Sequence, residues 1–162
     1  MAKVYLETSF FSECVTIRTG PIDLGRRATS LNWWNRQAKA FELCISPEVV
    51  RELCNANFPA SVRDAALELL EGLEVLAFTD EVASVAESLI RHRVMPGPAV
   101  EGDAVHVAIG MVHHVEYLMT WNQRHLANPR KRTHLAVIGA RMGLPVPEIV
   151  TPDLMIVEDD NG

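Results

Sequence analysis

Five short apolar segments, separated by longer segments of helical periodicity, constrain the fold of this 162-residue chain more than any other feature. The segments that we expect to form strands lie at residues 3–6, 41–45, 74–78, 116–121 and 148–151. Between them, apolar residues recur at the spacing of one helix face, and the clearest loop is expected at residues 94–102. Ser46 and Pro47 are typical of a helix start, and Gly143 is expected to end a last helix over residues 133–142. Strands that alternate with helices predict a parallel sheet with helices on both faces.

The length and composition indicate one folded domain. A chain of 162 residues is short for two domains, and its 48% hydrophobic and 22% charged residues are close to the average of globular proteins. The three cysteines include no Cys-x-x-Cys pair, so neither a disulfide framework nor a zinc ribbon is indicated, and Cys44 and Cys54 are expected in the core. Because no signal-like segment or bilayer-length apolar run is visible, we expect a cytoplasmic protein without membrane contact.

The charge is unevenly distributed along the chain. The net charge is −6, yet residues 24–41 and residues 117–147 carry basic side chains and no acidic ones, whereas acidic residues dominate residues 42–90. Two basic segments on an acidic background favour a local groove for a polyanion, and equally fit two solvated helix faces. The candidates for contact with nucleic acid are Arg26, Arg27, Arg124, Arg130 and Arg132.

Polar side chains that can carry chemistry fall near the carboxyl ends of the expected strands, where an open parallel sheet has its cleft. Glu7 follows the first strand, Glu48 and Glu52 share one face of the helix after the second, Asp103 opens a later helix, and Asn122 follows the fourth strand. Four of them have an ordinary structural explanation: Glu7, Glu48 and Asp103 as acids near a helix start, and Asn122 as a turn asparagine. Glu52 lies deeper in its helix and is the least well explained in this way. Taken together, oxygen ligands at one sheet edge suit Mg²⁺ or Mn²⁺ rather than zinc.

Two further features leave alternatives open. His106 lies one helical turn after Asp103, where it could hold a metal or simply form a hydrogen bond. Of the adjacent Trp33 and Trp34, we expect Trp34 in the core and Trp33 partly exposed. Alternatively, Trp33 anchors an interface with another protein, since tryptophan is enriched among interface hot spots. The sequence contains no glycine-rich phosphate-binding motif and no Gly-x-Ser-x-Gly nucleophile elbow, which weakens nucleotide-binding and serine-hydrolase interpretations.

Four blocks of the sequence resemble the four acidic motifs of PIN domains. They lie at residues 4–9, 46–53, 102–108 and 118–128, and the last two are the most specific. The arginine-rich turn before Thr29, the two tryptophans and the ending at residues 150–155 are similar to a VapC-like subgroup of toxins from type II toxin–antitoxin systems. The resemblance covers nearly the whole chain.

The resemblance implies a three-layer α/β/α sandwich with a central parallel sheet of about five strands, formed by residues 1–155 and followed by an acidic, disordered tail at residues 156–162. It also implies an endoribonuclease dependent on Mg²⁺ or Mn²⁺, a homodimer, and a cognate antitoxin protein as partner. Carried over by position, Glu7, Glu52 and Asp103 would be the metal ligands, and Asn122 would complete the catalytic set. Thr8 or Ser9 would help to position water or phosphate.

This chain departs from the family pattern at two of these positions. Glu7 stands where aspartate is usual, and the neutral Asn122 stands where aspartate is frequent. The second departure predicts a weaker second metal and an activity that is low, Mn²⁺-preferring or absent. The alternative function is therefore a PIN-fold module that binds RNA or protein without cutting. A second alternative function is a small metal-dependent phosphatase, but the absence of a phosphate-binding loop motif argues against it.

Overall fold

The computed structural model describes residues 1–55, 57–97 and 100–157, and within them a five-stranded, fully parallel sheet has the order β3-β2-β1-β4-β5. The strands are β1 (Lys3–Leu6), β2 (Glu42–Ile45), β3 (Glu74–Val75), β4 (Tyr117–Met119) and β5 (Glu148–Val150). All five predicted strands are present, most of them shorter than predicted. The order places β1, the first strand in the chain, at the centre of the sheet.

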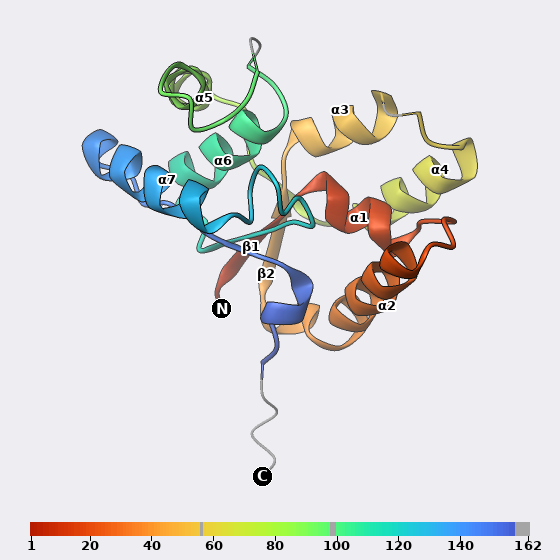
Figure 1. The fold of residues 1–162 in the computed structure, drawn as a ribbon. Helices are drawn as coiled ribbons and strands as arrows, with labels where there is room; N and C mark the ends of the chain where they lie inside the picture. The colour runs from red at the N-terminus through yellow and green to blue at the C-terminus, as the bar shows by residue number, and fades with distance from the viewer. Residues whose placement is uncertain (56, 98–99, 158–162) are drawn as a thin grey trace.

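Helices cover the sheet on both sides. They are α1 (Thr8–Cys14), α2 (Pro21–Arg36), α3 (Pro47–Asn55), α4 (Ala60–Leu69), α5 (Asp80–Arg91), α6 (Asp103–Val112) and α7 (Pro129–Met142), with short 3₁₀ turns η1 (Ala38–Ala40) and η2 (Pro152–Leu154). Figure 1 shows α1 to α4 on one side of the strands and α5 to α7 on the other. The predicted three-layer α/β/α sandwich is therefore confirmed. None of the described helices is long and apolar enough to cross a membrane.

The last helix shows how local signals set its two ends. It begins at Pro129, earlier than predicted, because the Asn128 side chain accepts a hydrogen bond from the Arg130 amide at 3.0 Å and proline suits the first helical position. It ends, as predicted, at Gly143, whose φ of 67° lies in the left-handed region that favours glycine.

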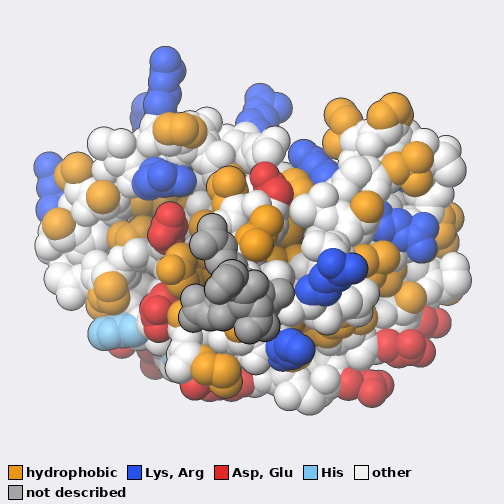
Figure 2. All heavy atoms as spheres, turned by 90° about the horizontal axis from the view of Figure 1, so that it is seen from below, with side chains coloured by type: hydrophobic (Ala, Val, Ile, Leu, Met, Phe, Trp, Pro, Cys, Tyr) orange, Lys and Arg blue, Asp and Glu red, His pale blue; other side chains and the backbone are white. Residues whose placement is uncertain are grey.

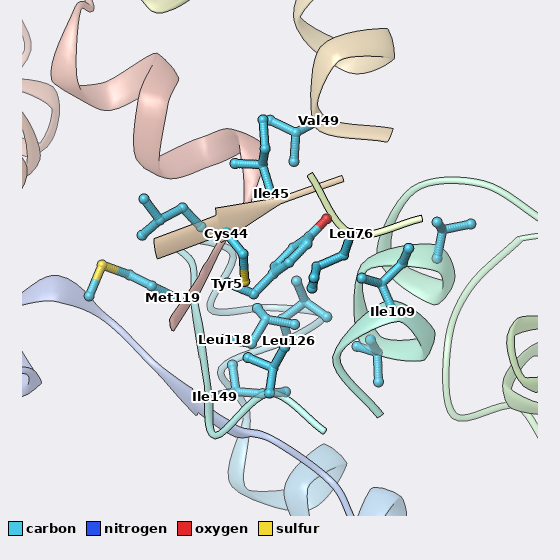
Figure 3. Packing of buried hydrophobic residues seen from close by; sticks show 14 of the residues in the cluster. Tyr5, Cys44, Ile45, Val49, Leu76, Ile109, Leu118, Met119, Leu126 and Ile149 are labelled. Atoms are coloured by element: carbon cyan, nitrogen blue, oxygen red, sulfur yellow. The ribbon is translucent and has the colours of Figure 1, made fainter. Parts of the chain in front are cut away.

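The core is built around the central strand. Val4, Tyr5 and Leu6 of β1 are fully buried, as expected for a strand with neighbours on both edges and helices on both faces. Successive side chains of a strand alternate between faces, and Figure 3 accordingly shows Tyr5 on the side of Ile109 from α6, opposite Val49 from α3. Tyr5 thus brings a buried hydroxyl group into a mostly apolar layer.

The strand register places the candidate residues at one edge. Leu6 pairs with Met119, and the Glu7 amide then donates to the Met119 carbonyl at 3.0 Å, so that Glu7 and Thr120 emerge side by side. Ser46 follows β2 at the same carboxyl edge. The sheet therefore delivers polar residues from three neighbouring strands to one place.

Two sequence predictions about burial are wrong. Trp33, not Trp34, is the fully buried tryptophan, because α2 turns Ser30 and Trp33 inward and leaves Trp34 half-buried beside them. Cys44 is buried as predicted, but Cys54 is exposed, since the buried face of α3 is formed by Val49 and Leu53.

Two other predictions fall partly on residues 98–99 and 158–162, which lie outside the described part of the chain. The described residues of the predicted loop at 94–102 are irregular, as expected, although Val94 and Met95 are buried. The predicted tail begins at residue 156; the Val157 amide donates to the Gln37 side chain at 2.9 Å, and the rest of the tail is not described. The domain boundary and the disorder of the tail stay predictions.

We expect Gly139→Ala to destabilise the protein by about 1–3 kcal/mol, because a Cβ at this position of α7 would overlap the Val146 side chain and approach the Leu144 carbonyl oxygen to 3.1 Å. Gly25→Ala in α2 is the matched control. No atom lies within 4 Å of its added Cβ, so a gain of about 0.5–1 kcal/mol in helix propensity is expected. Urea unfolding of both variants measures the difference, and equal stabilities would contradict the proposed close approach.

Candidate metal centre

Glu7 is held rigidly at the end of β1. The residue is 5% exposed, and its Oε2 atom accepts hydrogen bonds from the Ser9 amide at 3.0 Å, from the Ser9 hydroxyl, and from the Thr120 hydroxyl at 2.8 Å. Glu7 also caps the first turn of α1, so the structural explanation of this acid holds too. The second carboxylate oxygen, Oε1, faces His106 Nε2 at 3.9 Å. One oxygen is thus fixed by the protein and the other is directed towards the site.

Glu52 approaches the same point from α3. Its Oε1 atom accepts a hydrogen bond from the Thr8 hydroxyl at 2.7 Å and also contacts His106 Nε2. Its side chain is 28% exposed, which makes it more accessible than Glu7. The helix that starts at Ser46–Pro47 therefore carries Glu52 over the end of β1.

Asp103 opens α6, as predicted, with Gly102 as the capping residue. Both of its carboxylate oxygens face the Asn122 side-chain nitrogen, at 3.2 and 3.3 Å. The Asn122 oxygen accepts from the His125 amide at 3.1 Å, and this backbone donor fixes which end of the amide points to Asp103. Asn122 therefore offers Asp103 a hydrogen-bond donor rather than a fourth oxygen ligand.

Glu48, the other acidic residue of α3, is engaged elsewhere. It accepts hydrogen bonds from the Arg51 side chain at 2.5 and 3.0 Å and from the Gly102 amide at 2.7 Å. These contacts tie the start of α6 to α3. Glu48 is therefore occupied by structural contacts next to the site, and the choice of Glu52 as a ligand stays a prediction.

The carboxylates and the histidine influence each other's charge. Burial alone would raise the pKa of Glu52, but the hydrogen bond and positive charge of His106 outweigh it and hold that pKa below its ordinary value. Burial would likewise lower the pKa of His106, yet the hydrogen bond to Glu52 and the charge of Glu7 raise it. Burial, followed by the negative charge of Glu7, raises the pKa of Asp103. The negative charges repel one another, and a cation between them would relieve the repulsion.

The donor set fits a divalent cation. One ligand atom from each of Glu7, Glu52 and His106 lies within 4.8 Å of the others, and all three side chains are buried or half-buried. Asp103 stands beside this group and senses its charge, although its carboxylate is turned to Asn122. Sequence reasoning selected the three carboxylates; His106 was left undecided between metal binding and hydrogen bonding, and the structure places it inside the cluster.

The predicted nucleic-acid contacts are only partly brought together. Arg26 and Arg124 line a cleft of about 480 Å³ with Asn122, next to a cleft of about 420 Å³ that Glu7 and Glu52 line. Arg26 also lies over the Trp121 ring, 5.2 Å from its centroid. The three other predicted arginines, Arg27, Arg130 and Arg132, are exposed. Arg132 lines a separate cleft with Tyr117 and Glu148. Figure 2 shows that basic side chains on the face seen from below lie in several separate groups.

Comparison with solved structures identifies the fold. VapBC2 from Rickettsia felis, bound to a DNA fragment from its promoter, matches with a TM-score of 0.58 and 12% identity over 92% of this chain and 98% of the other. VapC20 from Mycobacterium tuberculosis, a toxin that cleaves the sarcin–ricin loop, matches with a TM-score of 0.57 and 19% identity over 75% of this chain and 92% of its own. The chain has a VapC-like PIN fold. DNA-bound VapBC from Salmonella typhimurium has the same fold, with a TM-score of 0.52 and 19% identity over 94% of this chain and 99% of the other.

The VapC-like fold confirms the fold that the resemblance in the four sequence blocks implied. No protein-family model matches the chain, and no curated protein matches it in sequence. At identities of 12% to 19%, the likeness concerns the fold. What the chain does must be argued from its own side chains.

We expect Asp103→Asn to stabilise the metal-free protein by about 1 kcal/mol at pH 7, because it removes a half-buried charge whose pKa is raised by burial and by the negative charge of Glu7. A carboxyl group whose pKa is raised on folding opposes folding once it is ionised. The advantage of the variant should therefore be present at neutral pH and disappear as the pH falls below the ordinary aspartate value of about 3.9. Thermal unfolding in EDTA across this range measures it.

Asp80→Asn is the matched control, since Asp80 also opens a helix but is exposed. Its loss should cost about 0.3–1 kcal/mol of favourable interaction with the helix dipole. If Asp103→Asn were destabilising to the same extent at neutral pH, Asp103 would be an ordinary helix-start acid.

Proposed function

We propose that this protein is a metal-dependent endoribonuclease that hydrolyses RNA phosphodiester bonds, and a VapC-like toxin neutralised by a cognate antitoxin. The observation that carries the proposal is the convergence of Glu7, Glu52 and His106 at the carboxyl edge of a VapC-like sheet, with Asp103 close enough to be affected by the charge of Glu7. One structural neighbour, VapC20, is a toxin that cleaves the sarcin–ricin loop. The chemistry of the cluster and the activity of that neighbour point to the same reaction.

The three carboxylates would hold a Mg²⁺ or Mn²⁺ ion, which supplies the Lewis acid that activates water and neutralises charge on a phosphodiester. Ser9 and Thr120 orient Glu7, and Thr8 orients Glu52, so both carboxylates are preorganised for binding. Asn122 steadies Asp103 without adding a negative charge. The half-exposed Glu52 lines the open cleft and is the group best placed to accept a proton from an attacking water.

The substrate backbone would lie along the two clefts that meet at Ser9. Arg26 and Arg124 would contact phosphates close to the cluster, and the exposed Arg27 and Arg130 would extend the contact. Arg132, in its separate cleft, is the least well placed of the five. Because phosphate contacts dominate such binding, affinity should fall steeply with salt.

Partners and location follow from the same proposal. Two of the neighbours are VapBC assemblies, which supports an antitoxin partner for this chain. Exposed apolar side chains at the start of α2 and just before it, Ile22, Leu24 and Ile17, offer surface that a partner or a second copy would cover. We place the protein in the cytoplasm, where it would meet cellular RNA. Failure of a neighbouring small gene product to co-purify would remove most of the support for the antitoxin.

The deciding experiment is cleavage of a mixed RNA pool by the purified protein in Mg²⁺, Mn²⁺ or EDTA, with Asp103→Asn alongside. We expect metal-dependent cutting that disappears in the variant, while circular dichroism and the melting temperature show that the variant is folded. If both proteins cut RNA equally faintly, or if neither metal supports cutting, the proposed endoribonuclease activity would be contradicted. Metal-independent RNA binding would then favour the non-cutting module, for which the neutral Asn122 is the supporting observation.

A further inference from the structure

His106 is an imidazole in an unusual place. It is fully buried, on a helix whose other inward residues are apolar, and it stands directly against two carboxylates. Polar groups this deep are retained in proteins when every polar atom has a partner. The partners of its two ring nitrogens therefore indicate what the side chain is placed to do.

The Nδ1 atom of His106 has a hydrogen-bond partner in the core. It lies 2.6 Å from the Tyr5 hydroxyl, which lies 2.7 Å from the Ser46 hydroxyl, and both of these side chains are buried. Figure 3 shows the Tyr5 ring fixed in the core between the sheet and α6, with its hydroxyl at the end away from Leu118 and Ile149. Either hydroxyl can donate or accept, so the Tyr5–Ser46 pair can serve an Nδ1 atom with or without a proton.

The Nε2 atom is thereby directed into the cluster. It contacts Glu52 and lies 3.9 Å from Glu7 Oε1, and these three atoms come from α6, α3 and the end of β1. A metal-binding histidine typically donates its other ring N–H to a buried partner, which sets the tautomer and the orientation of the ring. The Tyr5–Ser46 pair is placed to be that partner.

We propose that His106 binds the metal through Nε2 beside Glu7 and Glu52, and that this nitrogen makes the site select a first-row transition ion over Mg²⁺. The proposal rests on the metal site of the proposed function. Mg²⁺ prefers oxygen ligands and near-ideal octahedral geometry, whereas an imidazole favours later transition ions in the order Mn²⁺, Fe²⁺, Co²⁺. The opposing interpretation is that His106 only positions Glu52 by a hydrogen bond and touches no metal.

Pulsed electron paramagnetic resonance of the Mn²⁺-loaded protein distinguishes the two. A directly bound imidazole gives a ¹⁴N hyperfine coupling, which should be present in the unaltered protein and absent from His106→Gln. Glutamine keeps a hydrogen-bonding group at the buried position and so preserves the fold. His125→Gln is the matched control, because His125 lies near Asp103 on the same side of the site and should leave the coupling intact.

Titration calorimetry with Mn²⁺, Co²⁺ and Mg²⁺ adds a second readout. We expect affinity to rise from Mg²⁺ to Mn²⁺ to Co²⁺ and expect His106→Gln to weaken Co²⁺ binding at least about 10-fold while changing Mg²⁺ binding less. Tyr5→Phe, which removes only the outer partner of the ring, should weaken Co²⁺ binding about 10-fold.

The outcomes separate this inference from the function on which it rests. If Mn²⁺ binds without a nitrogen coupling, or with a coupling that remains in His106→Gln, the proposal that His106 is a metal ligand is overturned, whereas the proposed nuclease function is unaffected. No binding of any of the three ions overturns both. If the coupling were lost in His125→Gln and kept in His106→Gln, His125 would be the nitrogen ligand, and the proposal for His106 would be overturned.

Discussion

Glu7→Gln is expected to lower metal-dependent RNA cleavage about a thousandfold, equivalent to about 4 kcal/mol of transition-state stabilisation, while the protein stays folded. The Oε2 atom of Glu7 is committed to Ser9 and Thr120, and a glutamine oxygen can accept the same hydrogen bonds. The other end of the side chain, which faces His106 Nε2 at 3.9 Å, would then be an NH₂ group instead of a carboxylate oxygen. The change replaces one ligand atom with a donor that repels a cation. Single-turnover cleavage of one defined RNA at saturating Mn²⁺ measures the effect.

Glu48→Gln is the control for this prediction. Glu48 is another partly buried acid of the same region, but its oxygens are occupied by Arg51 and the Gly102 amide, which a glutamine can also serve in part. Cleavage within about threefold of the unaltered protein is expected, since no ligand atom is removed. If cleavage fell strongly in Glu48→Gln but little in Glu7→Gln, the metal would not be bound by the carboxylates proposed here.

The edge of the sheet on which this site lies could be predicted from the sequence. Strand segments alternating with helices require a parallel sheet, and a parallel sheet gathers the residues after its strands at one edge. Glu7 and Asn122 were found for this reason. Glu52 was preferred to Glu48 because the helix dipole explains an acid in the first turn better than one further along, and the structure gives Glu48 purely structural partners.

The contacts that decide the chemistry could not be predicted in this way. Whether His106 bonds to Glu52, and whether the Asn122 oxygen or nitrogen faces Asp103, depends on the register of β1 against β4 and on side-chain rotamers. Asn122 is the instructive case. Its position matches an acidic place of the family, but the His125 amide takes its oxygen, so the side chain presents a donor to the site.

The error at Trp33 and Trp34 has a different physical cause. In the sequence, the apolar residues Leu31, Trp34, Ala38 and Phe41 recur at steps of 3, 4 and 3, which is the spacing of one helix face and favours Trp34 as the core residue. In the structure α2 ends at Arg36, and the chain continues as the 3₁₀ turn η1 over Ala38–Ala40. A change in helical type shifts which residues face the core, and no local signal in the sequence marks it.

Trp33→Ala should be among the most destabilising single changes in this protein, at about 4 kcal/mol. The ring is 1% exposed, stacks on Phe41 with a centroid distance of 5.8 Å, and forms a T-shaped pair with Phe10 with a centroid distance of 5.6 Å. Its Nε1 atom donates to the Met155 carbonyl at 2.7 Å, which fastens the segment after β5 to α2. The variant loses the packing, leaves a cavity and leaves a buried carbonyl without its donor. Urea unfolding monitored by circular dichroism measures the loss.

Two companion variants separate these contributions. Trp33→Phe keeps most of the ring volume and removes the hydrogen bond, so a smaller loss of about 1–2 kcal/mol is expected, together with faster proteolysis near Met155. Trp34→Ala removes a half-buried ring whose centroid lies 6.0 Å from Phe10, and about 1–2 kcal/mol should be lost. If Trp34→Ala proved the more damaging of the two alanine variants, the phase of α2 would be that expected from the sequence, and the burial of Trp33 against Met155 would be wrong.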